Sequence, residues 1–258
     1  MLNHGTGTDP SIHETRAAAM TEPVVVIPGF MADARAFMPQ LVRLAQSRPV
    51  ILLTLTMAET VERVALAAAP LLPERFAVIG HGLGGNVAIE LLRRRPEAVS
   101  RIALLATDHL PEPPQRVAAQ EDLLVAARTG HLADSIARML PAEALFDAPW
   151  RDEVLALVQD MAATLGLDQF RLQLRALQRR PDQQRILRHA NLPTLILTGE
   201  VDTLVPRRRA ELLAAMMPQG CVEVIEDAGH MMQLEQPEAV TAALETFLSG
   251  RLPPLLLR

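Results

Sequence analysis

Short apolar runs alternate with segments of helical periodicity along most of this 258-residue chain. The apolar runs predict strands over Val24–Ile27, Val50–Leu55, Phe76–Gly80, Arg101–Ala106, Thr194–Thr198 and Val222–Ile225. Helical patterns follow them over Ala36–Ser47, Val61–Leu72, Asn86–Arg95, Arg208–Met217 and Pro237–Leu248. Strands that are apolar throughout and separated by helices are typical of a parallel sheet covered on both faces. The pattern therefore predicts an α/β fold with a doubly wound, mostly parallel sheet.

The remaining segments interrupt or flank this pattern. Residues 1–20 are polar and aperiodic and are expected to form a disordered or loosely ordered tail, and residues 251–258 form a short C-terminal tail. Residues 21–107 and 191–250 make up the predicted core. Residues 108–190 contain no strand-like run, and they follow a strand at the sheet edge where open α/β sheets bind ligands. We expect these residues to form a helical lid over a ligand pocket. The alternative is a helical insertion that only caps the sheet.

A glycine-rich turn carries the strongest chemical signal. The segment Val78–Asn86 follows a strand and opens a helix. In that context a nucleophile elbow reads Gly-x-Ser-x-Gly, and here Gly80 and Gly84 flank Gly82 at the nucleophile position. With Gly85 the same letters also match a Gly-x-Gly-x-x-Gly dinucleotide site. That site belongs on the first strand, with an acidic residue at the end of the next one, and this sequence offers neither.

Two later loops carry an acid and a histidine. Asp202 follows the strand that ends at Thr198, and His230 follows the last strand. The order elbow, then Asp, then His is the chain order of a catalytic triad in an α/β-hydrolase. Such an aspartate orients the imidazole and stabilises its protonated form. Asp108 also follows a strand and is an alternative partner for His230.

The chain resembles the α/β-hydrolase superfamily. It is similar to the small lidded esterases that begin near a Pro-Gly-Phe-x-x-Asp-x-Arg motif, here Pro28–Arg35. The resemblance spans roughly residues 23–107 and 191–249. It departs from the family at Gly82, where those enzymes carry the serine nucleophile.

This resemblance implies a role for several residues. The backbone N–H groups of Phe30 and Leu83 would form the oxyanion hole, with Asp202 as the triad acid and His230 as the base. Asp108 remains the alternative acid, because some relatives take it from that position. No cofactor or metal is implied.

Three functions remain open. The chain is expected to be related to carboxylic ester (acyl) hydrolases, with ordinary acyl-serine chemistry absent because Gly82 carries no hydroxyl. In the second interpretation, His230 with Asp202 acts as a general base on water or on an acidic substrate, as in cofactor-free lyases and oxygenases. In the third, the chain binds a small molecule without catalysis.

Composition narrows the chemistry and the partners. All 25 basic residues are Arg, which excludes a lysine Schiff base and pyridoxal-phosphate chemistry. Cys221 is the only cysteine, so an internal disulfide and a thiolate metal cluster are excluded. The net charge of -5, without a clustered basic face, argues against nucleic acid. No run has the length of a membrane span, so we expect a cytoplasmic protein with no membrane partner and a small apolar or acyl ligand.

Overall fold

A computed structural model describes residues 22–55 and 58–250, so the two predicted tails, residues 1–20 and 251–258, lie outside the described residues. Six strands form one sheet in the order β2-β1-β3-β4-β5-β6, and every neighbouring pair is parallel. The strands are β1 (Val24–Ile27), β2 (Val50–Leu52), β3 (Phe76–His81), β4 (Val99–Leu105), β5 (Thr194–Gly199) and β6 (Gly220–Ile225). The predicted α/β fold with a parallel, doubly wound sheet is confirmed.

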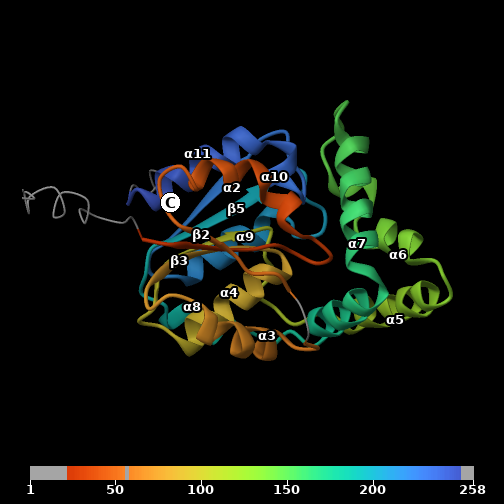
Figure 1. Ribbon diagram of the computed structural model, residues 1–258, viewed down its shortest axis with the longest axis horizontal. Coiled ribbons are helices and arrows are strands. Elements are labelled where there is room, and N and C mark those ends of the chain that lie inside the picture. Colours follow the sequence, from red (N-terminus) through yellow and green to blue (C-terminus); the bar gives the residue numbers. More distant parts are fainter. Residues whose placement is uncertain (1–21, 56–57, 251–258) are drawn as a thin grey trace, which may run out of the picture.

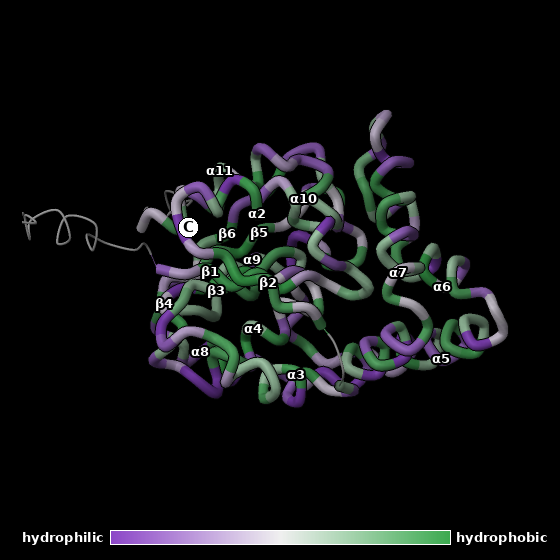
Figure 2. Tube along the Cα trace, viewed as in Figure 1, coloured by the Kyte–Doolittle hydropathy of each residue, from purple (hydrophilic) through white to green (hydrophobic). Residues whose placement is uncertain are grey.

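Helices cover both faces of the sheet because each buried strand presents apolar side chains in both directions (Figures 1 and 2). In β1, Val24 and Val26 pack into one core, while Val25 and Ile27 pack into the other. The first core is closed by α2 (Met38–Leu44), α10 (Met232–Glu235) and α11 (Pro237–Leu248). The second is closed by α3 (Val61–Ala68), α4 (Leu83–Arg94), α8 (Gln184–His189) and α9 (Arg207–Met216).

Element boundaries differ from the sequence prediction in three informative places. The strand predicted over Val50–Leu55 ends at Leu52, at the edge of the sheet. The predicted helix Ala36–Ser47 is a 3₁₀ turn over Ala34–Phe37 followed by α2, with Pro39 in the first turn of α2, where proline is tolerated. The helix after β3 begins at Leu83, so the glycine-rich turn leads directly into α4.

Three helices of the segment between β4 and β5 project from the sheet (Figure 1). They are α5 (Pro114–Arg128), α6 (Leu132–Met139) and α7 (Arg151–Gln178). α7 is bent at Gly166, whose φ of 77° and ψ of 178° are not helical. The fourth helix of the segment, α8, instead packs beside α4 and α9. None of the helices in the described part of the chain has the length and apolar composition needed to cross a bilayer.

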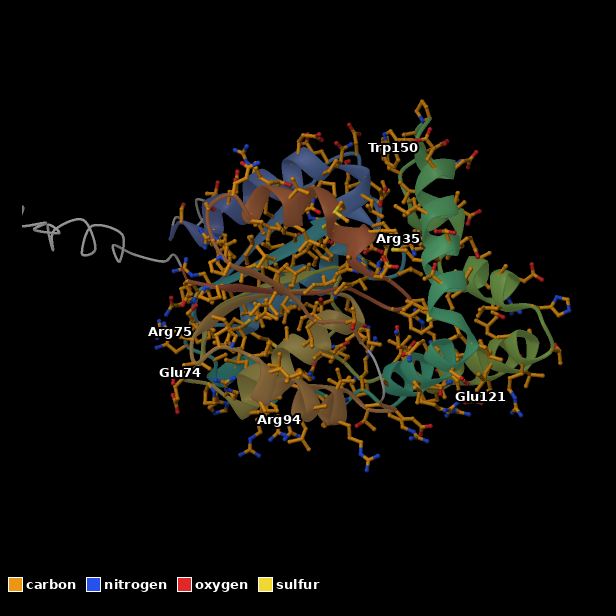
Figure 3. The ribbon with its side chains drawn as sticks, in the orientation of Figure 1. Arg35, Glu74, Arg75, Arg94, Glu121 and Trp150 are labelled. Carbon is orange, nitrogen blue, oxygen red and sulfur yellow. The ribbon has the colours of Figure 1, made fainter. Side chains whose placement is uncertain are left out.

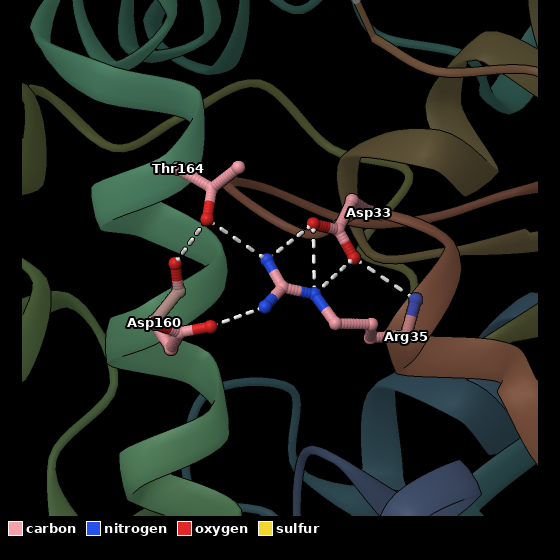
Figure 4. A network of polar contacts seen from close by, with 4 residues as sticks. All are labelled: Asp33, Arg35, Asp160 and Thr164. Atoms are coloured by element: carbon pink, nitrogen blue, oxygen red, sulfur yellow. Dashed lines mark hydrogen bonds and ion pairs between the residues drawn. The ribbon is translucent and has the colours of Figure 1, made fainter.

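Two polar anchors fix α7 to the loop that follows β1. Figure 3 shows Arg35 beside α7, on the far side of the molecule from Glu74 and Arg75. The Arg35 guanidinium binds the Asp33 carboxylate through Nη2 at 2.7 Å and reaches across to Asp160 and Thr164 on α7 (Figure 4).

The second anchor is Gln173, a buried side chain on the other half of α7. Its Oε1 accepts a hydrogen bond from the N–H of Met31 at 2.7 Å, and its Nε2 donates to the carbonyl of Leu55 at 2.9 Å. The two anchors lie on opposite sides of the Gly166 bend. Each half of α7 is therefore tied to the same loop.

Candidate active site

The turn between β3 and α4 places Gly82 above the carboxyl end of the sheet. Gly82 has φ 50° and ψ −117°, a conformation that side chains adopt only under strain. Its N–H donates to the carbonyl of Leu105 on β4 at 2.9 Å, which fixes the turn against the neighbouring strand. Gly84 allows α4 to lie against β1, because a Cβ there would stand 2.3 Å from the Ile27 oxygen. This strand–turn–helix geometry is what the predicted nucleophile elbow requires.

The position of a side chain at Gly82 is open towards His230. A Cβ built on Gly82 would lie 3.9 Å from His230 Nε2 and 3.9 Å from the carbonyl oxygen of Ala106, with no closer contact. A hydroxyl on that Cβ could approach the imidazole to within about 3 Å, the range of a hydrogen bond.

His230 and Asp202 form a hydrogen-bonded pair. His230 Nδ1 lies 3.0 Å from Asp202 Oδ2. The other carboxylate oxygen of Asp202 accepts from the N–H groups of Leu204 at 2.8 Å and Val205 at 3.0 Å. The Asp202 side chain is fully buried, whereas 16% of the His230 side chain is exposed. An ionised Asp202 can only accept, so the neutral imidazole carries its proton on Nδ1 and turns the lone pair of Nε2 towards Gly82.

The loop around His230 is held by Glu235 and by the chain that leads into α7. The buried carboxylate of Glu235 accepts from the N–H groups of Gly229 at 2.9 Å, Met231 at 2.8 Å and Phe146 at 2.8 Å. Burial raises the pKa of Glu235, and the three N–H donors oppose that rise. The N–H of His230 itself donates to the carbonyl of Ala144 at 2.7 Å. The position of the imidazole thus depends on the projecting helical segment as well as on the core.

His81, which precedes Gly82, supports the same loop from below. Its Nε2 lies 2.9 Å from the carbonyl oxygen of His230, and since a carbonyl can only accept, Nε2 carries the proton. Complete burial lowers the pKa of His81 to about 3, so the ring stays neutral. Its Nδ1 has no hydrogen-bond partner within the described residues. The ring therefore positions His230 through its backbone, and its one N–H is used for that contact.

The two residues that were predicted to form the oxyanion hole, Phe30 and Leu83, lie at the cavity. Leu83 is the first residue of α4, so its N–H has no acceptor within the helix. Phe30 precedes Met31, which is held at φ 50° by the hydrogen bond from its N–H to Gln173. Phe30 and Leu83 both line the cavity that contains Gly82 and His230. Preorganised N–H groups at this place are the usual means of stabilising an oxyanion.

The cavity above these groups is mostly apolar. Its walls are built from the loop after β1 and from α6 and α7, by Met31, Ile136, Met139, Leu140, Val158, Met161 and Leu177. Besides the two histidines, the polar side chains that line it are Asp108, Arg116 and Arg180. A site of this kind suits an apolar ligand that bears a few polar atoms.

Asp108 and Cys221 have other partners in the structure than His230. Asp108 lines the cavity, but its carboxylate accepts from the N–H of Leu110 at 3.1 Å and faces Arg180 at 3.5 Å, while His230 is bonded to Asp202. Cys221 is buried in β6, where its thiol donates to the Thr194 carbonyl, and burial raises its pKa to about 11. Within the described ranges no cluster of three or more His, Cys, Asp or Glu side chains could hold a metal ion.

Sequence reasoning missed the supporting residues Gln173, Glu235 and Arg180. Glu235 had a local signal, since it lies only five residues after His230, in the short helix α10 that follows a loop whose N–H groups must be satisfied. Gln173 had none, because its partner Met31 is 142 residues away.

Comparisons with known proteins agree with this architecture. Residues 24–243 match the alpha/beta hydrolase family. The chain is 31% identical over 208 residues to a pimeloyl-[acyl-carrier protein] methyl ester esterase of Aromatoleum aromaticum, covering 74% of this chain and 81% of the relative. It is 27% identical over 248 residues to RutD of Yersinia enterocolitica, a protein named as a carbamate hydrolase, with 87% and 86% covered.

Solved structures show the same fold. A thermophilic esterase from Thermogutta terrifontis superposes with a TM-score of 0.80 at 24% identity, over 89% of this chain and 90% of that one. The enol-lactonase from Burkholderia xenovorans LB400 gives a TM-score of 0.77 at 20% identity, over 89% and 92%. The resemblance noted from the sequence is confirmed at this level, and the chain belongs to the alpha/beta hydrolase family.

Proposed function

We propose that this chain carries the acyl-binding site of a carboxylic ester hydrolase in which Gly82 stands at the position of the nucleophilic serine. The observation that carries the proposal is the open approach from Gly82 to His230 Nε2, with Asp202 hydrogen-bonded behind the imidazole. A base that is oriented by a buried carboxylate and aimed at a strained strand-to-helix turn is the arrangement that activates a hydroxyl nucleophile.

The other parts of the site have matching roles. The N–H groups of Phe30 and Leu83 would bind the carbonyl oxygen of an ester and stabilise the charge that develops on it. The helices α5, α6 and α7 would act as a lid that limits access of water, and α6 and α7 would surround the acyl chain with apolar side chains. The relative from Aromatoleum is named as a methyl ester esterase, which favours an acyl ester as ligand.

Gly82 changes what the site can do with such a ligand. Without a hydroxyl no acyl-serine can form, and loss of the serine from a triad costs about 10⁶ in kcat. The oxyanion donors and the cavity do not depend on that hydroxyl, so binding is expected to persist. Glycine also relieves the strain of the turn, which costs about 1–3 kcal/mol for a residue with a side chain.

A second function is supported by the same space beside Gly82. His230 Nε2 could act as a general base on a water molecule or on an acidic substrate, with Asp202 stabilising the imidazolium that results. This function predicts ester turnover or proton abstraction by the unaltered chain that depends on His230. The absence of any such turnover would leave the chain as a small-molecule binder.

Restoring the hydroxyl tests the proposal. Gly82→Ser should raise the hydrolysis of p-nitrophenyl acetate, butyrate or octanoate by at least about 100-fold over the unaltered chain, because base, acid and oxyanion donors are already in place. Gly82→Ala is the matched control, since it brings the same backbone strain without a hydroxyl, and it should remain inactive. Adding His230→Ala to Gly82→Ser should abolish the gain.

The outcomes separate the two functions. A folded Gly82→Ser protein that is no more active than its Gly82→Ala control would contradict the serine-hydrolase origin of the site. Turnover by the unaltered chain that disappears in His230→Ala would instead establish the water-based reaction.

A further inference from the structure

The cavity contains a buried cation that the proposed chemistry does not use. Arg180 follows the end of α7 and lines the cavity together with Gly82 and His230, yet only 7% of its side chain is exposed. Its Nε donates to the carbonyl of Leu110 at 2.7 Å. That bond is the one well-formed hydrogen bond of the guanidinium among the described residues.

The terminal nitrogens of Arg180 are close to acids but poorly satisfied by them. Nη2 lies 2.9 Å from Glu112 Oε2 and 3.5 Å from Asp108 Oδ2, but it makes no hydrogen bond with acceptable geometry, and Glu112 Oε2 is likewise left without a donor. The structure records no hydrogen bond from Nη1 either. Buried guanidinium groups normally have an acceptor for each N–H group. Among the described residues Arg180 has a hydrogen-bond acceptor only for Nε, so the N–H groups of Nη1 and Nη2 could donate to a ligand.

The surrounding charges favour an anion. The groups that act electrostatically on Arg180 are Glu112, Asp108, Arg116 and Arg209. The two carboxylates therefore act within a group that holds three guanidinium groups, Arg180 included. Arg116 lines the same cavity, and its Nε lies 3.0 Å from Glu112 Oε1. Glu112 is therefore shared between two arginines and cannot neutralise both.

We propose that Arg180, assisted by Arg116, binds a carboxylate carried by the ligand away from its ester, so that the site selects half-esters of dicarboxylic acids. The proposal rests on the proposed function, because it assigns the far end of the same acyl ligand. The apolar side chains of α6 and α7 would contact the methylene chain between the two ends. A planar guanidinium matches a carboxylate with two parallel hydrogen bonds, which an uncharged chain end cannot make.

The test compares two ligands of equal length. Isothermal titration calorimetry with the unaltered chain at about pH 7.5, where a carboxyl group is ionised, measures the binding of monomethyl adipate and of methyl hexanoate. Monomethyl adipate should bind about 10- to 100-fold more tightly, as expected for hydrogen bonds to a charged group. This preference is measured without any substitution, so it does not depend on the folding of a variant.

Substitution then assigns the preference to Arg180. Arg180→Gln should reduce it to less than about twofold while the affinity for methyl hexanoate stays the same, and Arg180→Lys should retain part of it. The control is Arg179→Gln, an adjacent exposed arginine that pairs with Glu59 outside the cavity and should keep the full preference.

The possible failures are distinguishable. If both esters bind equally, or the neutral ester binds more tightly, the carboxylate site is refuted and the acyl site stands. If the preference survives in Arg180→Gln, Arg180 does not recognise the carboxylate. If neither ester binds, the proposed acyl site fails as well.

Discussion

The neutral buried ring of His81 makes the protein sensitive to mild acid. The ring is fully enclosed, and burial lowers its pKa from 6.5 to about 3. In the unfolded chain the same ring takes up a proton once the pH falls below 6.5. The unfolded state then binds more protons than the folded state, so the free energy of unfolding falls as the pH falls.

The size of the effect follows from the distance between the working pH and the unfolded pKa. Above pH 6.5 the ring is neutral in both states and contributes no pH dependence. A pH of about 5 is roughly 1.5 units below the pKa of the ring in the unfolded chain, so protonation of that ring stabilises the unfolded state by about 2 kcal/mol. The loss continues down to the folded pKa of about 3.

His81→Gln isolates this contribution. Glutamine does not titrate, and its amide can still donate to the carbonyl of His230, which His81 Nε2 contacts at 2.9 Å. Urea unfolding of both proteins at several pH values between about 7.5 and 5 gives the free energies of unfolding. The unaltered protein should lose about 2 kcal/mol more than the variant over this range. Parallel pH profiles of the two proteins would refute the assigned burial of a neutral His81.

Two further predictions concern the support of His230. Asp202→Asn, made in the Gly82→Ser background, should lower kcat in steady-state kinetics about 10⁴-fold with little change in KM, because the amide can hold the wrong tautomer of His230. An unchanged kcat would show that Asp202 does not orient His230. Glu235→Gln should lower the free energy of unfolding, measured in urea, by about 1–3 kcal/mol, because an amide cannot accept from all the N–H groups that the carboxylate binds. An unchanged free energy of unfolding in this variant would contradict the assigned role of the carboxylate.

The sequence was sufficient for the fold because the fold depends on local periodicity. Each strand of the sheet contains apolar residues of the kind found in buried parallel strands, and these segments were recognisable without knowledge of their neighbours. The turn at Gly82 was predictable for the same reason, since strand, glycines and helix are contiguous. The end of β2 and the split before α2 were not, because the edge position of the strand and the first turn of the helix depend on tertiary context.

The support of the site could not be predicted because it joins distant segments. Gln173 fixes the Met31 loop across 142 residues, and Glu235 binds Phe146 across 89. No periodicity or motif in the sequence marks such pairs. The unsatisfied donors of Arg180 are even less visible, since they depend on the geometry of Glu112 and Asp108 rather than on residue types.

Backbone strain around the cavity argues that the site is held by its surroundings rather than by its nucleophile. Met31 and Ala106 have φ values of 50° and 45°, a conformation that costs about 1–3 kcal/mol for each residue with a side chain. Both line the cavity, and Met31 is held by Gln173 from α7. Glycine relieves strain only at position 82 and leaves these two residues strained. Because the hydrogen bond that holds Met31 does not involve Gly82, and Gly82 bonds to the strand before Ala106 only through its backbone N–H, a serine at that position should meet a site that is already in its working geometry.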